Sequence, residues 1–319
     1  MKALKPTPLE LFFSSADSTD PRMGQMARPG QVAEVAAQHW YLLGYPDDEG
    51  IRLNHGRPGA SLAPNVIRHH LYRMTPDLLQ PHAQPIHDLG NLPLDLPLAE
   101  RHKWAGELAA LVFKKGGRWL ALGGGHDYGY ADGLGFLSHF QQTDVRPLLI
   151  NFDSHLDVRP IDKGFNSGTP FRRLLEEFSN FDLIEIGMQS QCNAKAHLEW
   201  LKARGGHILT LNDILKSESS PRASIQKFLL PHCNANRPTW ISFDMDAFAS
   251  AYAPGCSQSW ATGLTPNDVL PTLDFICEKN QVYGLGVYET SPPFDVDDRT
   301  SRLAALLIHR LIHASRPLI

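Results

Sequence analysis

Short runs of consecutive apolar residues alternate with longer amphipathic segments along most of the chain. The apolar residues in these runs mostly follow one another instead of alternating with polar ones. The runs therefore predict strands that are buried on both faces of a parallel sheet. The expected strands are residues 40–45, 119–123, 147–152, 183–187, 207–210, 239–243 and 283–288. The expected helices are residues 64–72, 98–114, 169–177, 194–204, 266–278 and 299–313.

The alternation of strands and helices predicts the fold class. Over this length it indicates an α/β protein with three layers, α/β/α, a mostly parallel central sheet and right-handed crossovers. The sequence has no composition break, internal repeat or low-complexity segment. We therefore expect a single domain over residues 1–319, in which residues 1–35 form an irregular N-terminal lead-in because they lack a clear period.

Composition narrows the class of protein. The chain has 30 Lys and Arg residues against 34 Asp and Glu residues, unlike the strongly basic balance of a nucleic-acid-binding domain. It has no run of about 18 apolar residues that predicts a membrane span, and its start lacks the apolar stretch of a signal peptide. Its four cysteines form no CxxC pair and are too few for a disulfide framework. We expect a cytoplasmic protein with no nucleic-acid or membrane partner, and the 15 histidines raise the question of a metal.

Three polar motifs follow predicted strands, and in parallel α/β sheets ligands bind at the carboxyl ends of the strands. The first is a run of three glycines that leads to a histidine, a pattern that is also common in a plain strand-to-helix turn. The second has the pattern Asp-x-His-x-Asp, and the third has the pattern Asp-x-Asp. Together they supply two imidazoles and four carboxylates, from His126, Asp153, His155, Asp157, Asp244 and Asp246.

These side chains predict a centre for two metal ions. Alternate residues of an extended chain share one face, so the carboxylates of each motif are brought close together, and burying them without a cation would be costly. Carboxylates with imidazole suit Mn²⁺ or a similar ion, and the absence of thiolate ligands argues against structural zinc. Six ligands exceed the needs of one ion but fit two ions that share ligands in a hydrolytic centre.

Glu289 forms a fourth polar motif, after the predicted strand 283–288. A carboxylate at this sheet edge could bind a cationic group of a substrate. Taken alone, however, Glu289 is more simply interpreted as an ordinary loop residue.

The motifs, in this order, resemble those of the ureohydrolase superfamily, which includes arginase, agmatinase, guanidinobutyrase and formimidoylglutamase. Residues 44–50 and 54–60 are similar to the N-terminal signature of that family, and the resemblance extends from about residue 40 to the C-terminus. It implies the arginase-like fold and a hydrolase with two Mn²⁺ ions per subunit that acts on the C=N carbon of a guanidine or formimidoyl group. It also implies homo-oligomers, either trimers or hexamers.

The resemblance implies which residues of this chain bind the two metal ions, because they stand at the positions of the family's ligands. His126, Asp153, Asp157 and Asp244 are implied to bind one ion. Asp153, His155, Asp244 and Asp246 are implied to bind the other, with Asp153 and Asp244 bridging. Glu289 falls where the family has the carboxylate that holds the C=N cation of the substrate.

Within the superfamily, formimidoylglutamase is the most similar member. Gly125 stands directly before His126, and residues 157–160, 166–171, 253–255 and 297–304 look like the corresponding formimidoylglutamase segments. This similarity implies hydrolysis of N-formimidoyl-L-glutamate to L-glutamate and formamide, a step of histidine degradation. Residues 256–260 and 289–292 depart from the pattern at the expected pocket wall. The alternatives are a guanidino hydrolase that releases urea and a non-catalytic metal-binding scaffold.

A mechanism for this reaction assigns further roles. Asp157 or Asp246 would handle the proton of the attacking water, and Glu289 would orient the substrate. The carboxylates of a glutamate derivative need polar partners, for which we expect Arg159, Asn166 and Ser167. Arg172 and Arg173 are also possible partners, but helix-surface positions are at least as plausible for them. His309 and His313 lie at helical spacing and are expected to be structural, because the pair lacks the Glu of an HExxH motif.

Overall fold

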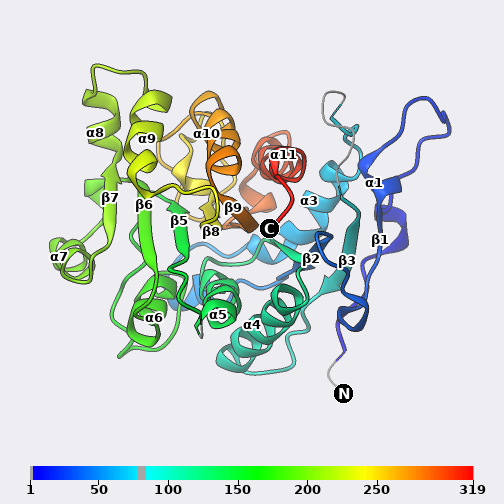
Figure 1. Ribbon diagram of the computed structural model, residues 1–319, viewed down its shortest axis with the longest axis horizontal. Coiled ribbons are helices and arrows are strands. Elements are labelled where there is room, and N and C mark those ends of the chain that lie inside the picture. Colours follow the sequence, from blue (N-terminus) through cyan, green and yellow to red (C-terminus); the bar gives the residue numbers. More distant parts are fainter. Residues whose placement is uncertain (1–2, 78–83, 142, 319) are drawn as a thin grey trace.

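The computed structural model describes residues 3–77, 84–141 and 143–318, and its centre is a nine-stranded sheet. The strands lie in the order β1-β3-β2-β4-β9-β8-β5-β6-β7, and all neighbouring strands are parallel (Figure 1). Their bounds are β1 Ala27–Pro29, β2 Trp40–Gly44, β3 Ile86–Asn91, β4 Arg118–Leu122, β5 Leu148–Phe152, β6 Asp182–Met188, β7 His207–Thr210, β8 Pro238–Asp244 and β9 Gln281–Tyr288.

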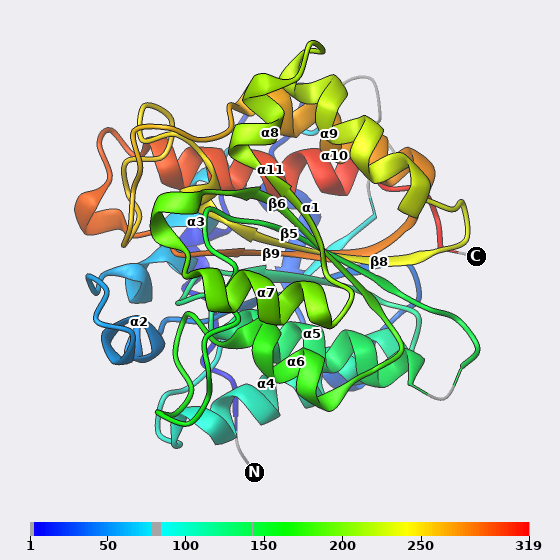
Figure 2. The same ribbon diagram turned by 90° about the vertical axis from the view of Figure 1, so that its left-hand side faces the viewer.

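Helices cover both faces of the sheet (Figure 2). On one side lie α4–α7, and on the other lie α8–α11. Their bounds are α4 Leu98–Lys114, α5 Tyr128–Phe140, α6 Pro170–Glu177, α7 Lys195–Ala203, α8 Leu211–Lys216, α9 Pro221–Leu229, α10 Pro266–Lys279 and α11 Arg299–Ala314. The remaining helices are α1 Met23–Met26, α2 Glu49–Leu53 and α3 Ala63–Leu71, of which α3 contacts α11. This arrangement confirms the predicted three-layer α/β/α fold.

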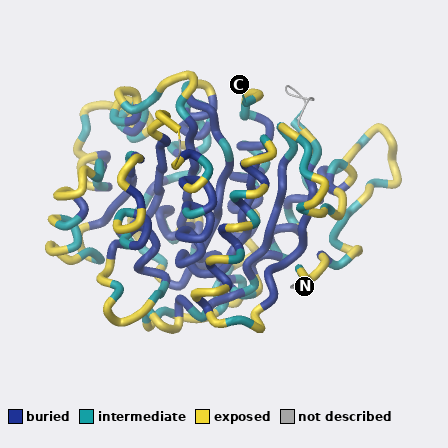
Figure 3. Tube along the Cα trace, turned by 60° about the horizontal axis from the view of Figure 1, so that its bottom comes forward, coloured by how far each residue is buried: buried dark blue, intermediate teal, exposed yellow. Residues whose placement is uncertain are grey.

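The two layers of helices enclose two separate hydrophobic cores, and β2 shows how the sequence builds both. Trp40 and Leu42 belong to the core on one face of the sheet, whereas Tyr41 and Leu43 belong to the core on the other face. All four side chains are fully buried. The central strands are therefore dark along most of their length in Figure 3, and most exposed residues lie in loops and on helices. The consecutive apolar residues of the sequence follow directly from this double burial.

The predicted strands and helices are all present, but sequence periodicity missed β1, β3 and several helices. The strand β3 was missed because it carries polar residues, among them Asp88. The Asp88 carboxylate is buried with Arg68 in an ion pair of 2.8 Å between Arg68 Nε and Asp88 Oδ2. The strand β1 lies within residues 1–35, which we expected to be irregular, and its Ala27 pairs with Ile86 of β3 at the edge of the sheet.

The helix α5 was missed because it contains three glycines, which lower helix propensity. Two of these glycines let α5 approach its neighbours closely. A Cβ atom at Gly135 would lie 2.6 Å from Ala109 Cβ on α4, and one at Gly133 would lie 2.4 Å from a methyl carbon of Leu174 on α6. Close helix packing therefore outweighs the low propensity. Within the described residues, no helix is long and apolar enough to cross a membrane.

Candidate metal centre

Four neighbouring strands at the centre of the sheet, in the order β4-β9-β8-β5, carry the predicted site at their carboxyl ends. His126 follows β4, Asp153 follows β5, Asp244 ends β8 and Glu289 follows β9. Because the strands are parallel and adjacent, four segments that are far apart in the sequence meet at one edge of the sheet. The sequence motifs and the topology thus agree on the place of the site.

The first group of potential ligands surrounds a buried imidazole nitrogen. His126 Nδ1 lies 3.0 Å from Asp153 Oδ2, 3.0 Å from Asp157 Oδ2 and 3.3 Å from Asp244 Oδ2. Among the described residues this nitrogen has no hydrogen-bond partner of acceptable geometry, although its side chain is fully buried. Three carboxylate oxygens around one nitrogen form a donor set that fits a divalent cation.

The second group adjoins the first and shares one residue with it. His155 Nδ1 lies 3.4 Å from Asp153 Oδ1 and 3.1 Å from Asp246 Oδ2. Asp153 belongs to both groups, as the sequence resemblance implies, whereas Asp244 belongs to the first group alone. A bridging role for Asp244 stays a prediction. Burial acts to raise the pKa of Asp153, but the neighbouring imidazoles of His126 and His155 outweigh it and hold that pKa well below its usual range.

The other carboxyls of the cluster show the cost of burying several anions together. Burial raises the pKa of Asp157 to about 6, and the charge of Asp153 adds to the effect. Burial and the charges of Asp246 and Asp153 raise the pKa of Asp244 well above its usual value. Burial likewise raises the pKa of Asp246. A cation at this place would remove the repulsion, so the electrostatics and the donor atoms both fit a metal centre.

Two neighbouring residues orient the side chain of His126. Its Nε2 lies 2.8 Å from Ser242 Oγ, and its ring stacks on Tyr288 at 4.9 Å between centroids. The Tyr288 hydroxyl in turn donates to the buried Asp132 carboxylate at 2.5 Å. Because Ser242 occupies Nε2, the other ring nitrogen, Nδ1, is turned toward the carboxylates.

Replacing Ser242 by Ala is therefore expected to weaken metal binding by about 10- to 100-fold, a typical effect of losing a partner behind a ligating histidine. Metal titrations of the metal-free variant and wild type would measure the change. Replacing Ser224, on the outer helix α9, by Ala provides the control. Equal metal affinity for the Ser242 variant and wild type would contradict the orienting role.

Asn151 and Glu185 lie behind the cluster and were not anticipated from the sequence. Asn151 Nδ2 donates to Glu185 Oε2 at 2.8 Å and lies 3.4 Å from Asp153 Oδ2. Both side chains are almost fully buried. Burial and the nearby charge of Asp153 raise the pKa of Glu185 well above its usual value. The pair therefore adds a neutral amide contact to Asp153, next to the contact from His126.

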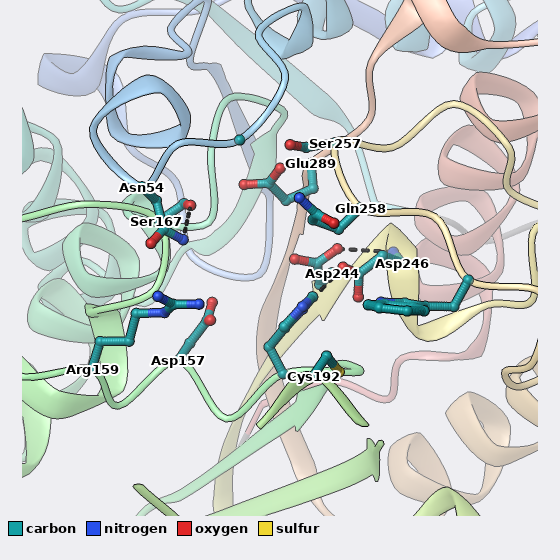
Figure 4. Close-up of a pocket in the computed structure, with 13 residues that line it drawn as sticks. Asn54, Asp157, Arg159, Ser167, Cys192, Asp244, Asp246, Ser257, Gln258 and Glu289 are labelled. Atoms are coloured by element: carbon teal, nitrogen blue, oxygen red, sulfur yellow. Dashed lines mark hydrogen bonds and ion pairs between the residues drawn. The ribbon is translucent and has the colours of Figure 1, made fainter. Parts of the chain in front are cut away.

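A cavity of about 280 Å³ opens onto both ligand groups (Figure 4). Its volume suits a small polar metabolite rather than a polymer. The lining residues are Asn54, Gly56, His155, Asp157, Arg159, Ser167, Cys192, Asp244, Asp246, Ser257, Gln258, Trp260 and Glu289. The lining residues that were given no role from the sequence are Asn54, Gly56, Cys192, Ser257, Gln258 and Trp260. Of these, Asn54 and Gly56 lie in the segment 54–60 that resembles the family, and three lie in the segment 256–260 that departs from it.

The structure brings Arg159 and Ser167 to this cavity but does not bring Asn166 there. The side-chain oxygen of Asn166 instead accepts a hydrogen bond from the Gly168 N–H at 3.0 Å. The Asn166 N–H donates to Thr169 Oγ1 at 3.0 Å. Asn166 therefore stabilises the turn that presents its neighbour Ser167, and a direct contact with a substrate is not supported by its position.

Arg172 and Arg173 also have partners away from the cavity. Arg172 pairs with Glu176 one turn along α6. The guanidinium of Arg173 lies 3.3 Å from the centroid of the Tyr130 ring and donates to His102 Nδ1 at 2.8 Å. These contacts favour a structural role for both arginines over a role in binding the substrate.

Glu289 lines the cavity, and its Oε1 accepts a hydrogen bond from the His126 N–H at 3.0 Å. Burial raises the pKa of Glu289 to about 8, against the opposing effect of that hydrogen bond. Its backbone is left-handed, with φ of 61°, and so is that of Asp157, with φ of 48°. Such conformations are uncommon outside glycine and tend to occur at functional sites. Glu289 is thus not an ordinary exposed loop residue.

The remaining histidines do not form a comparable cluster within the described part of the chain. His309 Nε2 contacts the Thr75 carbonyl at 2.8 Å, and its ring lies 4.5 Å from that of His313. This geometry agrees with the structural role expected for the pair.

The buried carboxyls make the stability of the metal-free protein depend on pH. A carboxyl with a raised pKa in the folded state destabilises the fold when it ionises, so stability is lost as pH rises through about 6 for Asp157 and about 8 for Glu289. The melting temperature of chelator-treated protein should therefore fall between about pH 5.5 and about pH 8.5. Metal ions also bind better when protons compete less, so stabilisation by metal should be larger at the higher pH. Calorimetric melting with and without metal would test this, and a pH-independent difference would contradict it.

Comparison with known proteins identifies the family. The sequence profile of the Arginase family matches residues 38–314, and the chain belongs to this family. Among curated relatives, the formimidoylglutamase of Staphylococcus carnosus is 35% identical over 277 residues, which cover 85% of each chain. The formimidoylglutamase of Legionella pneumophila (strain Paris) is 32% identical over 287 residues, covering 85% of this chain and 84% of that protein.

Solved structures agree with the sequence comparison. The structure of Trypanosoma cruzi formiminoglutamase with two Mn²⁺ ions matches with a TM-score of 0.80 and 28% identity, covering 93% of this chain and all of that one. Formimidoylglutamase from Bacillus subtilis matches with a TM-score of 0.80 and 26% identity, covering 95% of this chain and 93% of that one. The family, the fold and the place of the ligand cluster are therefore consistent with one another.

Proposed function

We propose that the protein is a formimidoylglutamase, which hydrolyses N-formimidoyl-L-glutamate to L-glutamate and formamide with two Mn²⁺ ions. One observation carries the proposal: two groups of metal-binding side chains share Asp153 and face a cavity of about 280 Å³ that also contains Glu289 and Arg159. The relatives named formimidoylglutamase support this substrate over other members of the family.

In this proposal the ligand groups hold the ions, and the ions supply a nucleophile at neutral pH and Lewis acidity toward the substrate. One ion would be held by His126, Asp153, Asp157 and Asp244. The other would be held by Asp153, His155 and Asp246. The family resemblance adds Asp244 to this second group. The oxygen and imidazole donors suit Mn²⁺.

The protein's own side chains would orient the substrate and move protons. The Glu289 carboxylate would accept hydrogen bonds from the protonated amidine and hold its carbon near the ligand groups. Asp157 or Asp246 would take a proton from the water and return it to the amine of the departing glutamate. The balanced products are formamide, which receives the water oxygen, and glutamate, which receives the proton.

Arg159 and Ser167 would bind a substrate carboxylate in the cavity, because Arg159 is the one Lys or Arg among the described residues that line it. We propose further that the chain forms a single domain, acts in the cytoplasm in histidine degradation and assembles into trimers or hexamers. These points rest on the sequence resemblance.

A substrate panel tests the proposed function. Protein loaded with Mn²⁺ would be incubated separately with N-formimidoyl-L-glutamate, arginine, agmatine and 4-guanidinobutyrate, and glutamate, formamide and urea would be measured. We expect glutamate and formamide in equal amounts from the first substrate. Urea from a guanidino substrate would instead indicate a guanidino hydrolase, and no turnover of any substrate would favour a metal-binding scaffold.

A further inference from the structure

One wall of the cavity is formed by two loops that are linked by hydrogen bonds. Asn54, at the end of α2, donates from Nδ2 to Ser167 Oγ at 3.0 Å. The Gly50 carbonyl accepts hydrogen bonds from both the Asn54 N–H and the Ser167 N–H, each at 3.1 Å. The two side chains are therefore fixed beside each other at the cavity, as Figure 4 shows. The Asn54 amide has a second N–H that this bond does not use.

The side chain of Arg159 passes close to the Cα atom of Gly168 and so reaches the same wall. A Cβ atom at Gly168 would lie 2.6 Å from Arg159 Cδ, 2.8 Å from Arg159 Nε and 3.1 Å from Asn54 Nδ2. The backbone joins the same positions, because the Arg159 N–H donates to the Gly168 carbonyl at 2.8 Å. The missing side chain at residue 168 thus provides the space in which the arginine and the asparagine approach each other.

The Arg159 guanidinium lines the cavity without a hydrogen bond or ion pair to another described residue. Figure 4 shows no hydrogen bond or ion pair between Arg159 and the other lining residues. Its side chain is exposed to solvent, so an anionic ligand can reach the guanidinium. A guanidinium beside an amide N–H is a donor set that suits a carboxylate, which can accept from both.

We propose that Gly168 and Asn54 determine specificity for substrates that carry a carboxylate away from the amidine carbon. Gly168 acts as a positioning residue by leaving the space through which Arg159 reaches the cavity. Asn54 contributes its second amide N–H to the same carboxylate. This inference rests on the proposed amidine hydrolysis and adds to it the residues that recognise the far end of the substrate.

Replacing Gly168 by Ala tests the positioning role cleanly. The φ of Gly168 is not in the left-handed region, so alanine adds a methyl group without backbone strain. The atoms that it meets belong to flexible side chains, so they can move aside while the fold is retained. We therefore expect the melting temperature and the Mn²⁺ content to stay near those of wild type while Arg159 is displaced.

The readout compares two substrates with the same reacting group. For N-formimidoyl-L-glutamate, Gly168→Ala should lower kcat/KM by about 10- to 100-fold, mainly by raising KM. The reason is that the displaced Arg159 loses its charged hydrogen bond to the substrate carboxylate. Asn54→Ala should lower it by about 3- to 10-fold. For N-propylformamidine, which has no carboxylate, both variants should resemble wild type. Equal losses on both substrates, or no loss on either, would overturn the proposal.

A double-mutant cycle identifies the residue through which Gly168 acts. If Gly168 works through Arg159, the variant with Gly168→Ala and Arg159→Gln together should be no worse than Arg159→Gln alone. Additive losses would contradict that route. Arg172→Gln is the matched control, because Arg172 pairs with Glu176 and lies outside the cavity lining.

Calorimetric titration with glutarate separates this inference from the proposed reaction. Glutarate has two carboxylates but no amidine, so its binding requires no turnover. Gly168→Ala should weaken glutarate binding by at least about 10-fold relative to wild type and to Arg172→Gln. If wild type fails to hydrolyse formimidoylglutamate but shows this difference, the reaction is wrong and the carboxylate site stands. Unchanged glutarate binding would overturn the site even in an active enzyme.

Discussion

Asp244→Asn is expected to reduce kcat/KM for N-formimidoyl-L-glutamate by at least about 1,000-fold, or about 4 kcal/mol of transition-state stabilisation. Asp244 Oδ1 accepts the Asp246 N–H at 2.8 Å, and the amide oxygen of asparagine can keep that bond. Its Oδ2, which faces His126 Nδ1, would lose its negative charge. The change therefore removes a ligand while preserving the local turn.

Two further measurements separate loss of a ligand from loss of the fold. The Mn²⁺ content of Asp244→Asn should fall below two ions per chain. Its metal-free form should melt at a higher temperature than metal-free wild type, because one member of a repulsive carboxylate cluster is gone. Asp274→Asn, which changes an outer ion pair with Arg310, is the control and should keep activity and metal. Full activity of Asp244→Asn would contradict the metal centre.

Glu289→Gln is expected to cause a loss of about 10- to 100-fold in kcat/KM with both Mn²⁺ ions retained. A hydrogen bond between charged groups contributes about 1.5–3 kcal/mol, and glutamine keeps the shape but not the charge. The His126 N–H can still donate to the amide oxygen, so the turn should persist. Steady-state kinetics and metal analysis of the same preparations would measure both quantities.

Glu278→Gln provides the matched control for this prediction, because Glu278 is an exposed residue at the end of α10. It should retain wild-type kinetics. A Glu289 variant that loses metal as severely as Asp244→Asn would mean that Glu289 acts as a ligand rather than as a substrate-orienting group. A variant with unchanged kinetics would mean that it does neither.

The central architecture could be predicted from the sequence because two local signals agree. Doubly buried parallel strands appear as consecutive apolar residues, and the polar motifs stand directly after them. Parallel pairing then places His126, Asp153 and Asp244 at one edge without further information. The elements that were missed carry conflicting signals, such as the glycines of α5 and the buried ion pair of Asp88 in β3.

The cavity wall was predicted less well than the ligand groups, for a physical reason. Its residues come from loops whose spacing has no period, and their roles depend on contacts across the fold. Asn54 meets Ser167 across 113 positions of the chain. Asn166 was expected to contact the substrate, but its side chain accepts a hydrogen bond within a turn. The space beside Gly168 depends on how Arg159 and Asn54 pack in the fold, and the sequence does not contain that information.

The most direct test of the account is a titration of metal-free protein with Mn²⁺ while formamide release from N-formimidoyl-L-glutamate is measured. Activity is expected to rise until two ions are bound per chain and then to stay constant, because both ligand groups are needed. Full activity with one ion, or no formamide at any metal loading, would contradict it.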